Sequence, residues 1–359
     1  MSRLFSPFPL RSLTLRNRIA VSPMCQYSSD DGFASDWHLV HLGGFATGGA
    51  ALVISEATAV TANGRISPHD LGLWKDAHVE MLARITHFVR AQGACAGVQL
   101  AHAGRKASTK RPWEGGGTVS VAEGGWTDVM APSAIAFSEA YPMPHALSEA
   151  GVAGVIAAFR EAAVRALAAG FEVIELHAAH GYLLHQFLSP LSNQRTDAWG
   201  GSFDHRVRLT IEVVDAIRTV WPERLPLFVR LSATDWVEGG WTVADTVRLS
   251  ALLRTHGVDL VDCSSGGLAH GARVSVGPGY QVPFARQVRA ESGMPTGAVG
   301  LITDAQQAEA IIAAGDADLV FLARELLRQP RWPLAAAHAL GAEEPWPKQY
   351  ERAKLPKST

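Results

Sequence analysis

The chain has 359 residues, of which 47% are hydrophobic, so it can bury a large core. Its formal net charge of −2 excludes the basic surface of a nucleic-acid-binding protein or of a protein held on an anionic membrane. No apolar run reaches the roughly 18 residues of a membrane span, and the first residues lack the apolar core of a signal peptide. The cysteines Cys25, Cys95 and Cys263 each lie in or beside an apolar run, which indicates reduced thiols and a cytoplasmic protein.

Short apolar runs alternate with amphipathic stretches along most of the chain. Residues 9–17 are predicted to form a small hairpin before this alternation begins. The apolar runs are short and continuous, which is typical of parallel strands that are buried on both faces. The predicted strands are residues 18–24, 51–55, 94–100, 172–176, 227–231, 260–263, 296–299 and 319–322.

Helical periodicity separates several of these strands. Apolar residues recur every three or four positions in three stretches, residues 76–92, 149–169 and 203–220. Thr242 and Asp304 each precede a polar residue by three positions, as helix-capping residues do. About eight strand–helix units in one chain favour an α/β fold of the (β/α)₈ TIM barrel type over an open sheet. We therefore predict a single barrel domain over residues 1–340.

Two regions do not follow the alternation. Residues 101–147, after the third predicted strand, contain glycine-rich turns and four prolines. A connection this long is usually a functional lid or is disordered, and its place after a barrel strand predicts a lid over the active site. The tail, residues 341–359, is rich in proline and charge, for which disorder is the default. Trp346 and Tyr350 favour instead that the tail docks at a subunit interface.

The fourth predicted strand leads into His177, His180 and Tyr182. Gly181 breaks the chain there, so two imidazoles and a phenol are expected where a rigid strand runs into an open loop. Two neutral histidines can both donate hydrogen bonds to one oxygen atom, and the tyrosine carries a weakly acidic proton. This set suits a reaction in which negative charge develops on a carbonyl oxygen.

Two other interpretations of the histidine pair remain open at this point. A histidine at the end of a strand is most often structural. The spacing of His177 and His180 also allows a zinc site, but no neighbouring cysteine pair or carboxylate ligand supports one. We therefore expect no resident metal, and the function depends on what surrounds the pair.

The other strand ends converge on the same face if the fold is a barrel. Gly300, after the seventh strand, permits close backbone approach, and Arg324, after the eighth, offers a cation, so this pair is a candidate phosphate site. Arg230 lies within the fifth strand, where an unpaired buried charge would be costly. It therefore needs an anionic ligand or, as the alternative, an internal salt bridge.

Taken together, these motifs resemble the old yellow enzyme family of flavin-dependent ene reductases, in the branch that contains thermophilic-like and xenobiotic reductases. They span nearly the whole chain in the family's order, with matching segments that begin at Asn17, Pro23, Gln99, His177, Ser189, Gly200, Ala298 and Arg324. The sequence departs from the family pattern at Trp199, where tyrosine is usual, and at His205, where asparagine is usual.

The resemblance implies a barrel that holds non-covalent FMN. The residues that it places around the cofactor are Ser22, Pro23, Met24, Cys25, Ala57, Gln99, Arg230, Gly300, Ala323 and Arg324. Among these, Cys25 is expected to tune the flavin, Gln99 and Arg230 to face its pyrimidine end, and the last three to hold the phosphate. The residues that it places around the substrate are Tyr27, His177, His180 and Tyr182.

The resemblance also implies an oxidoreductase with a ping-pong mechanism. NADPH, with NADH as a possibility, reduces FMN and leaves, and an α,β-unsaturated carbonyl compound then accepts the hydride. His177 and His180 bind the carbonyl oxygen, and Tyr182 protonates the α-carbon. The expected assembly is a homodimer or homotetramer, in which Arg352 of the tail reaches the active site of a neighbouring subunit.

Two other classes of function remain as alternatives. A cofactor-free barrel lyase would need a Schiff-base lysine or a metal at a strand end, and Lys106 in the lid is the nearest lysine. A non-catalytic flavin-binding protein would account for the cofactor contacts but not for His177, His180 and Tyr182 together.

Overall fold

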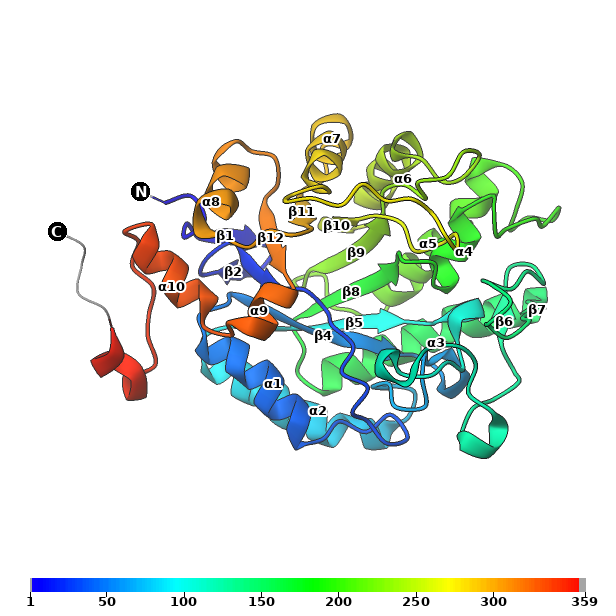
Figure 1. Ribbon diagram of the computed structural model, residues 1–359, viewed down its shortest axis with the longest axis horizontal. Coiled ribbons are helices and arrows are strands. Elements are labelled where there is room, and N and C mark those ends of the chain that lie inside the picture. Colours follow the sequence, from blue (N-terminus) through cyan, green and yellow to red (C-terminus); the bar gives the residue numbers. More distant parts are fainter. Residues whose placement is uncertain (1, 355–359) are drawn as a thin grey trace.

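The computed structural model describes residues 2–354 and contains a closed barrel of eight parallel strands (Figure 1). The strands follow one another around the barrel in chain order, and the last pairs with the first. They are β3 (Ile19–Val21), β4 (Leu52–Ala59), β5 (Cys95–Ala101), β8 (Val173–Ala178), β9 (Leu227–Ser232), β10 (Leu260–Ser264), β11 (Thr296–Val299) and β12 (Leu319–Leu322). The predicted (β/α)₈ TIM barrel is therefore confirmed.

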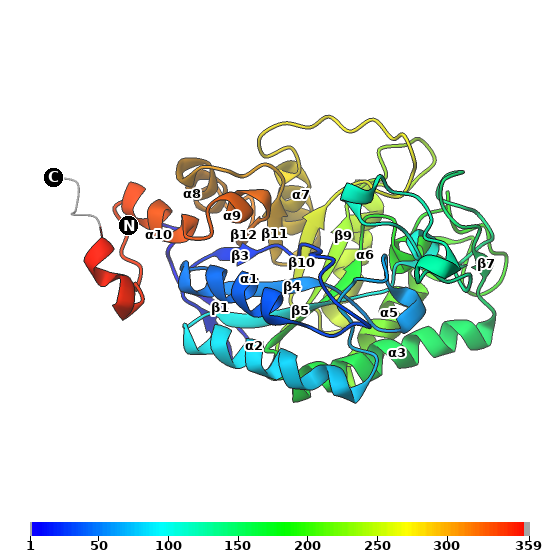
Figure 2. The ribbon, with the colours of Figure 1, turned by 60° about the horizontal axis from the view of Figure 1, so that its bottom comes forward.

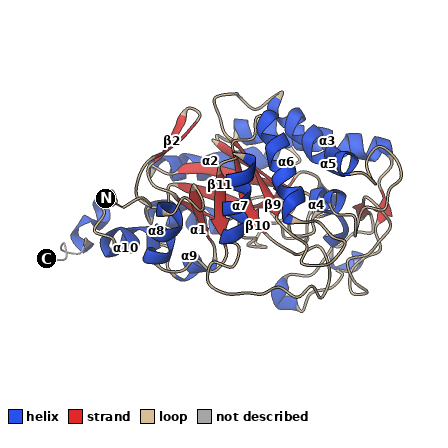
Figure 3. Ribbon diagram, turned by 90° about the horizontal axis from the view of Figure 1, so that it is seen from above, coloured by secondary structure: helices blue, strands red, loops and turns tan. Residues whose placement is uncertain are grey.

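Helices surround the barrel on its outer side (Figure 3). They are α1 (Asp36–Thr47), α2 (Val79–Ala91), α3 (Glu149–Ala168), α5 (Phe203–Arg218), α6 (Val243–Thr255), α7 (Val282–Ser292), α8 (Ala305–Ala313) and α10 (Trp332–Ala339), with the short α4 (Leu183–Leu188) and α9 (Arg324–Arg328). Their apolar faces and the outward side chains of the strands form one continuous core. Within residues 2–354, no helix has the length and apolar character needed to cross a membrane.

The helix caps form as the sequence predicts. The Thr242 hydroxyl accepts a hydrogen bond from the backbone of Asp245, and the Asp304 carboxylate accepts one from the backbone of Gln307. These bonds satisfy amide groups that the first turn of a helix leaves unpaired. The predicted helix over residues 76–92 begins as a single 3₁₀ turn, η2 (Asp76–His78), before α2.

The predicted hairpin is also confirmed. Strands β1 (Phe8–Leu10) and β2 (Leu13–Leu15) pair antiparallel, and Leu10 and Leu15 are buried against the inward residues of the barrel, including Phe228 and Leu319. Because these residues lie toward the beginning of their strands, the hairpin closes the amino-terminal end of the barrel. The opposite end is left for the active site.

Three strand boundaries differ from the prediction in ways that affect the site. β3 ends at Val21 rather than at residue 24, since Pro23 has no N–H with which to continue the ladder. β4 continues to Ala59 through an irregularity between Ser55 and Ala57, so Ala57 lies within the strand. β8 continues to Ala178, so His177 is part of the strand rather than of the loop that follows.

The long segment after β5 covers one end of the barrel. It contains three 3₁₀ turns, η3 (Gly104–Lys106), η4 (Pro112–Glu114) and η5 (Val121–Glu123), and two short strands, β6 (Met130–Ala131) and β7 (His145–Ala146). Figure 2 shows this segment beside residues 265–281, which arch over the same end of the barrel. The Arg105 guanidinium donates to the Leu268 carbonyl oxygen at 2.8 Å and joins the two segments.

The tail lies at the other end of the molecule from the lid (Figure 1). Its 3₁₀ turn, η6 (Lys348–Ala353), follows a buried contact between Glu344 and Arg16 at 3.1 Å. Arg331 stacks on the ring of Tyr350 at 4.4 Å. The part of the tail within residues 341–354 thus packs on the barrel, whereas residues 355–359 of the predicted tail lie outside the described residues.

Candidate active site

The inward side chains of the strands change from apolar to polar along the barrel axis. On β8, Val173 packs in the lower core, and Glu175 and His177 follow on the same face because side chains alternate along a strand. Phe228 and Arg230 repeat this order on β9. The barrel therefore has an apolar floor and a polar layer above it, at the end that the lid covers.

His177 is buried at the end of β8, and its protonation state follows from its contacts. The backbone N–H of Ala179 donates to Nδ1 of His177 at 3.3 Å, so the proton of the neutral ring lies on Nε2. Burial, and then the charge of Arg230, lower the pKa of His177 well below its ordinary value. The ring is therefore a neutral hydrogen-bond donor, as the sequence analysis requires.

His180 lies beside it, with ring centroids 5.1 Å apart and ring planes nearly perpendicular. Its Nε2 lies 2.7 Å from the Ser264 hydroxyl, and its backbone N–H donates to the Ser232 hydroxyl at 2.9 Å. Burial, and then Arg230, also lower the pKa of His180 well below its ordinary value. Both imidazoles are therefore uncharged and held at one place.

A close backbone contact fixes the position of His180. Gly181 has a φ of +75°, and a Cβ at this position would lie 2.2 Å from the carbonyl oxygen of Gly267. A Cβ at Gly267 would in turn lie 2.7 Å from Cα of His180. A residue with a Cβ at either position would clash, so the two glycines allow the end of β8 to pack directly against the segment after β10.

Tyr182 completes this group of side chains. Its ring centroid lies 4.9 Å from that of His177, in an edge-to-face arrangement. Burial, followed by the influence of Cys25 and Tyr27, raises the pKa of the Tyr182 phenol well above its ordinary value. The phenol therefore keeps its proton until a strong base develops beside it, which is the behaviour of a general acid.

Lys106 also reaches this site, although the sequence analysis did not assign it a role there. Its ammonium donates to the carbonyl oxygens of His180, at 2.8 Å, and of Gly267. It lies over the rings of Phe137, at 4.1 Å, and of Tyr182, at 5.6 Å. Burial lowers the pKa of Lys106 to about 7. The motif after β5 contains this lysine, but only the folded lid shows that it faces the histidines.

The polar layer below the histidines contains two buried pairs. The amide of Gln99 donates to Glu175 at 2.7 Å, and Nε of Arg230 lies 2.8 Å from a carboxylate oxygen of Asp262. Of the two partners considered for Arg230, the structure shows the internal one, Asp262, its neighbour in register on β10, and contact of Arg230 with FMN stays a prediction. Burial, and then Asp262, raise the pKa of Glu175 to about 8.

The segment after β3 forms another wall. It carries the predicted residues Ser22, Pro23, Met24, Cys25 and Tyr27, of which Ser22 is fully buried. Burial, and then nearby acidic side chains, raise the pKa of the Cys25 thiol well above its ordinary value, so this thiol stays protonated. The Tyr27 ring makes an edge contact with Trp113 of the lid at 5.7 Å.

The ends of β11 and β12 line a cavity of about 230 Å³, which Ser264, the hydroxyl partner of His180, also lines. Gly300, Ala323 and Arg324 all line it, so the structure brings the three predicted phosphate ligands together. Gly300 has a φ of +120°, and a Cβ there would lie 2.9 Å from the Gln281 amide nitrogen. The cavity is open, the backbone at Gly300 can approach a ligand closely, and Arg324 offers an exposed cation. These features fit a phosphate group.

One predicted site residue does not lie at the active-site end of the barrel. Arg352 is exposed on η6, at the end of the molecule away from the lid (Figure 1). Its proposed role in the active site of a neighbouring subunit stays a prediction. Within residues 2–354, no three histidine, cysteine or acidic side chains are grouped as metal ligands.

The chain matches the model of the NADH:flavin oxidoreductase / NADH oxidase family over residues 3–343. It belongs to this family. It is 51% identical over 351 residues to the NADPH dehydrogenase of Geobacillus thermodenitrificans (strain NG80-2), which covers 97% of this chain and 98% of the relative. It is 48% identical over 352 residues to the NADPH dehydrogenase of Bacillus subtilis (strain 168), with 98% of each chain covered.

A solved structure supports the same assignment. Morphinone reductase superposes with a TM-score of 0.80 at 28% sequence identity, over 96% of this chain and 91% of that one. The resemblance to the old yellow enzyme family is therefore confirmed, and so are the oxidoreductase class and FMN as the cofactor of the family. The residue assignments within the site remain predictions, supported by the geometry described above.

Proposed function

We propose that this chain is an FMN-dependent ene reductase that uses NADPH to reduce carbon–carbon double bonds conjugated to a carbonyl group. The observation that supports this most directly is the group His177, His180 and Tyr182. The ring centroid of the neutral His177 lies 5.1 Å from that of the neutral His180 and 4.9 Å from that of the protonated Tyr182. Such groups can stabilise a developing oxyanion and supply a proton.

Different groups of residues would hold different parts of FMN. Gly300, Ala323 and Arg324 would hold the phosphate in the open cavity, and Gln99 and Arg230 would hold the pyrimidine end. Ser22, Pro23, Met24, Cys25 and Ala57 would line the ring. FMN, when bound, supplies hydride chemistry between the nicotinamide and the substrate.

The substrate chemistry then follows from the side chains. Nε2–H of His177 and a ring N–H of His180 bind the carbonyl oxygen, which draws electron density from the double bond and makes the β-carbon accept hydride. The negative charge that develops on the oxygen is stabilised by donors already in place. Tyr182 gives its proton to the α-carbon, and the phenolate it becomes must later regain a proton.

Lys106 bears on the lyase alternative, because a lysine with a lowered pKa is what a Schiff base requires. Its ammonium is occupied by the carbonyl oxygens of His180 and Gly267, so its place in the structure is to hold the lid to the end of β8. The family assignment also identifies the chain as an oxidoreductase. The structure therefore favours the reductase.

Anaerobic half-reactions test the proposal. The purified protein is expected to be yellow, to bleach on addition of NADPH, and to regain its colour on addition of cyclohexenone. A colourless protein that releases no flavin on denaturation would contradict the proposal. A protein that bleaches but never regains its colour with any of several enones, maleimides or quinones would support the flavin-binding alternative instead.

A further inference from the structure

A small cavity lies beside Tyr182. Its free volume of about 10 Å³ is close to the space that one water molecule needs. Its described lining residues are Ala57, Ala59, Gly64, Ile66, Asp70, Ala101, Ala103 and Tyr182. Among these, Asp70 is the only acid other than the phenol, so one carboxyl and one phenol share a space of the size of one water.

The contacts of Asp70 leave one of its oxygens available to carry a proton. Its side chain is only 1% exposed, and Oδ2 accepts a hydrogen bond from the backbone N–H of Ile66 at 2.6 Å. Oδ1 is buried and has no hydrogen-bond partner. An ionised carboxylate would leave this oxygen unsatisfied, whereas a neutral carboxyl can place its proton there and donate it.

The charged and titratable groups around Asp70 favour the neutral form. Burial, and then the negative charge of Glu56 on β4, raise the pKa of Asp70 well above its ordinary value, whereas hydrogen bonds from the backbone of Ile66 and Ser67, and then the charge of Arg65, lower it. Cys25 and Tyr27, on the segment after β3, keep their protons and carry no charge against it. Glu56 is itself held by His38, at 3.2 Å, and by a backbone N–H.

The proposed function creates a need for such an acid. Each turnover leaves Tyr182 as a phenolate in a place where burial disfavours that form. The phenol must regain its proton before the next substrate can be protonated. We propose that Asp70 returns this proton to Tyr182 between turnovers, through one water molecule in the cavity they share.

In this step the O–H bond at Oδ1 of Asp70 breaks and the O–H bond of Tyr182 forms. The water accepts the proton from Asp70 and passes one of its own to the phenolate. Asp70 is left as a carboxylate, which takes a proton from the solvent and returns to its neutral form. No electrons move, and the net change is one proton from solvent to Tyr182.

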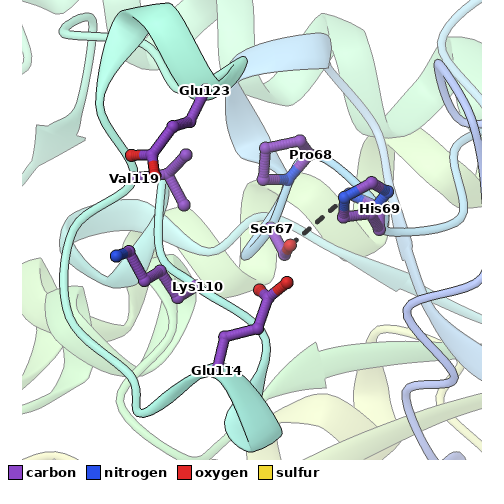
Figure 4. Close-up of a pocket in the computed structure, with 7 residues that line it drawn as sticks. All are labelled: Ser67, Pro68, His69, Lys110, Glu114, Val119 and Glu123. Carbon is purple, nitrogen blue, oxygen red and sulfur yellow. Dashed lines mark hydrogen bonds between the residues drawn. The ribbon is translucent and has the colours of Figure 1, made fainter.

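The segment that carries Asp70 lies between this cavity and a second, polar one. The second cavity has a volume of about 280 Å³ and is lined by Ser67, Pro68 and His69 and, from the lid, by Lys110, Glu114, Val119 and Glu123. Figure 4 shows Ser67 and the carboxylate of Glu114 facing each other across it. Ser67, Pro68 and His69 precede Asp70 directly in the chain, so we take this cavity as the side from which solvent protons return to Asp70.

The relay can be separated from the chemistry because it acts only after the first turnover. Asp70→Asn keeps an oxygen that accepts from the Ile66 N–H but has no acidic proton. In the holoenzyme, flavin reduction by NADPH and the first reoxidation by cyclohexenone are expected to stay within about twofold of wild type. Steady-state kcat is expected to fall by about tenfold or more, and added acetic acid is expected to restore it in part.

Two variants act as controls. Ile66→Val changes the lining of the cavity without changing an acid, and the ratio of first to later turnovers is expected to stay at the wild-type value. Tyr182→Phe is expected to slow the first reoxidation, because the proton donor itself is lost. An unchanged first reoxidation in Tyr182→Phe would overturn the proton role of Tyr182 and, with it, the relay.

Two further outcomes would contradict the proposed role of Asp70. If Tyr182→Phe slows the first reoxidation but Asp70→Asn sustains wild-type kcat, the proposed function stands and the relay is wrong. If Asp70→Asn slows flavin reduction and both turnovers equally, without rescue by acetic acid, Asp70 is a structural residue and the relay is again wrong.

Infrared spectroscopy of the resting protein gives a test without turnover. At neutral pH, the wild type is expected to show a carbonyl band of a protonated carboxyl that Asp70→Asn lacks, and Glu175 contributes equally to both spectra. Identical spectra in this region would overturn the proposal. If Asp70→Asn does not fold, the same band is expected to weaken transiently during turnover of wild type, and its constancy would overturn the relay.

Discussion

The two sides of the active-site end of the barrel differ in whether their functional side chains are neutral or charged. At the end of β8, His177 is buried and His180 and Tyr182 are half-buried, and all three stay neutral because desolvation disfavours their ionisation. At the ends of β11 and β12, an open cavity presents the exposed Arg324 beside a glycine that permits close approach. One side excludes water so that neutral donors act strongly, whereas the other keeps a permanent charge for an anionic ligand.

The strongest test of this contrast removes a neutral donor. His177→Ala is expected to slow enone reduction by about 10²–10³-fold, or ~2.7–4 kcal/mol, because the oxyanion loses a preorganised hydrogen bond. FMN content is expected to stay at the wild-type level, since the phosphate side is untouched. Stopped-flow reoxidation measures the rate, and a phenol titration measures the binding of an oxyanion mimic. Unchanged enone turnover would show that His177 is structural.

The second test concerns the titration of Glu175, in the buried polar layer below the histidines. The pKa of Glu175 is about 8 in the folded protein, above its ordinary 4.5, so the folded state holds a proton that the unfolded chain releases between these values. The free energy of unfolding is therefore expected to fall as pH rises through this window. The loss relative to Glu175→Gln is up to ~1.4 kcal/mol for each pH unit.

Urea unfolding of the FMN-free wild type and of Glu175→Gln, across the same window, measures this difference in slope. The slopes matter rather than the absolute stabilities, because the substitution also alters the hydrogen bond from Gln99. Parallel pH profiles for the two proteins would mean that Glu175 is ionised in the folded state.

The third test addresses the charged side. Arg324→Ala is expected to weaken FMN binding by about tenfold, because a charge-assisted hydrogen bond contributes ~1.5–3 kcal/mol and less where solvent screens it. The reoxidation rate of FMN-saturated enzyme is expected to be unchanged. Arg328→Ala is the matched control, since Arg328 lines the same cavity but is already paired with Glu325. Equal losses in both variants would indicate a general effect of surface charge.

The smallest expected effect concerns the tail. If Arg352 enters the active site of a neighbouring subunit, Arg352→Ala is expected to raise KM for enones a few-fold, as for a solvent-exposed charge worth about 1 kcal/mol or less. Deleting residues 346–359 is expected to raise KM similarly and to loosen the oligomer, with FMN retained. Lys348→Ala is the control for a general change of charge on η6. Light scattering and steady-state kinetics that match wild type for the deletion would show that the tail takes no part.

Local patterns predicted much of this molecule correctly. The apolar runs that became β9, β11 and β12 were placed to within a residue, because continuous apolar character leaves little choice but a buried strand. The predicted ends of the strands beside the active site were less accurate. Pro23 ended β3 early and the irregularity in β4 drew Ala57 into the strand, since pairing with a neighbour decides these ends.

The sequence alone determined the order of strands and helices, the hairpin, the motif of two histidines and a tyrosine, and the family resemblance. These depend on residue type and spacing, which are local. The tertiary structure decided that Arg230 pairs with Asp262, that Lys106 reaches the end of β8, that Asp70 shares a cavity with Tyr182, and that η6 lies at the end of the molecule away from the lid. Each of these joins segments far apart in the chain, and burial, which sets the pKa of every group in the site, exists only once those segments have packed together.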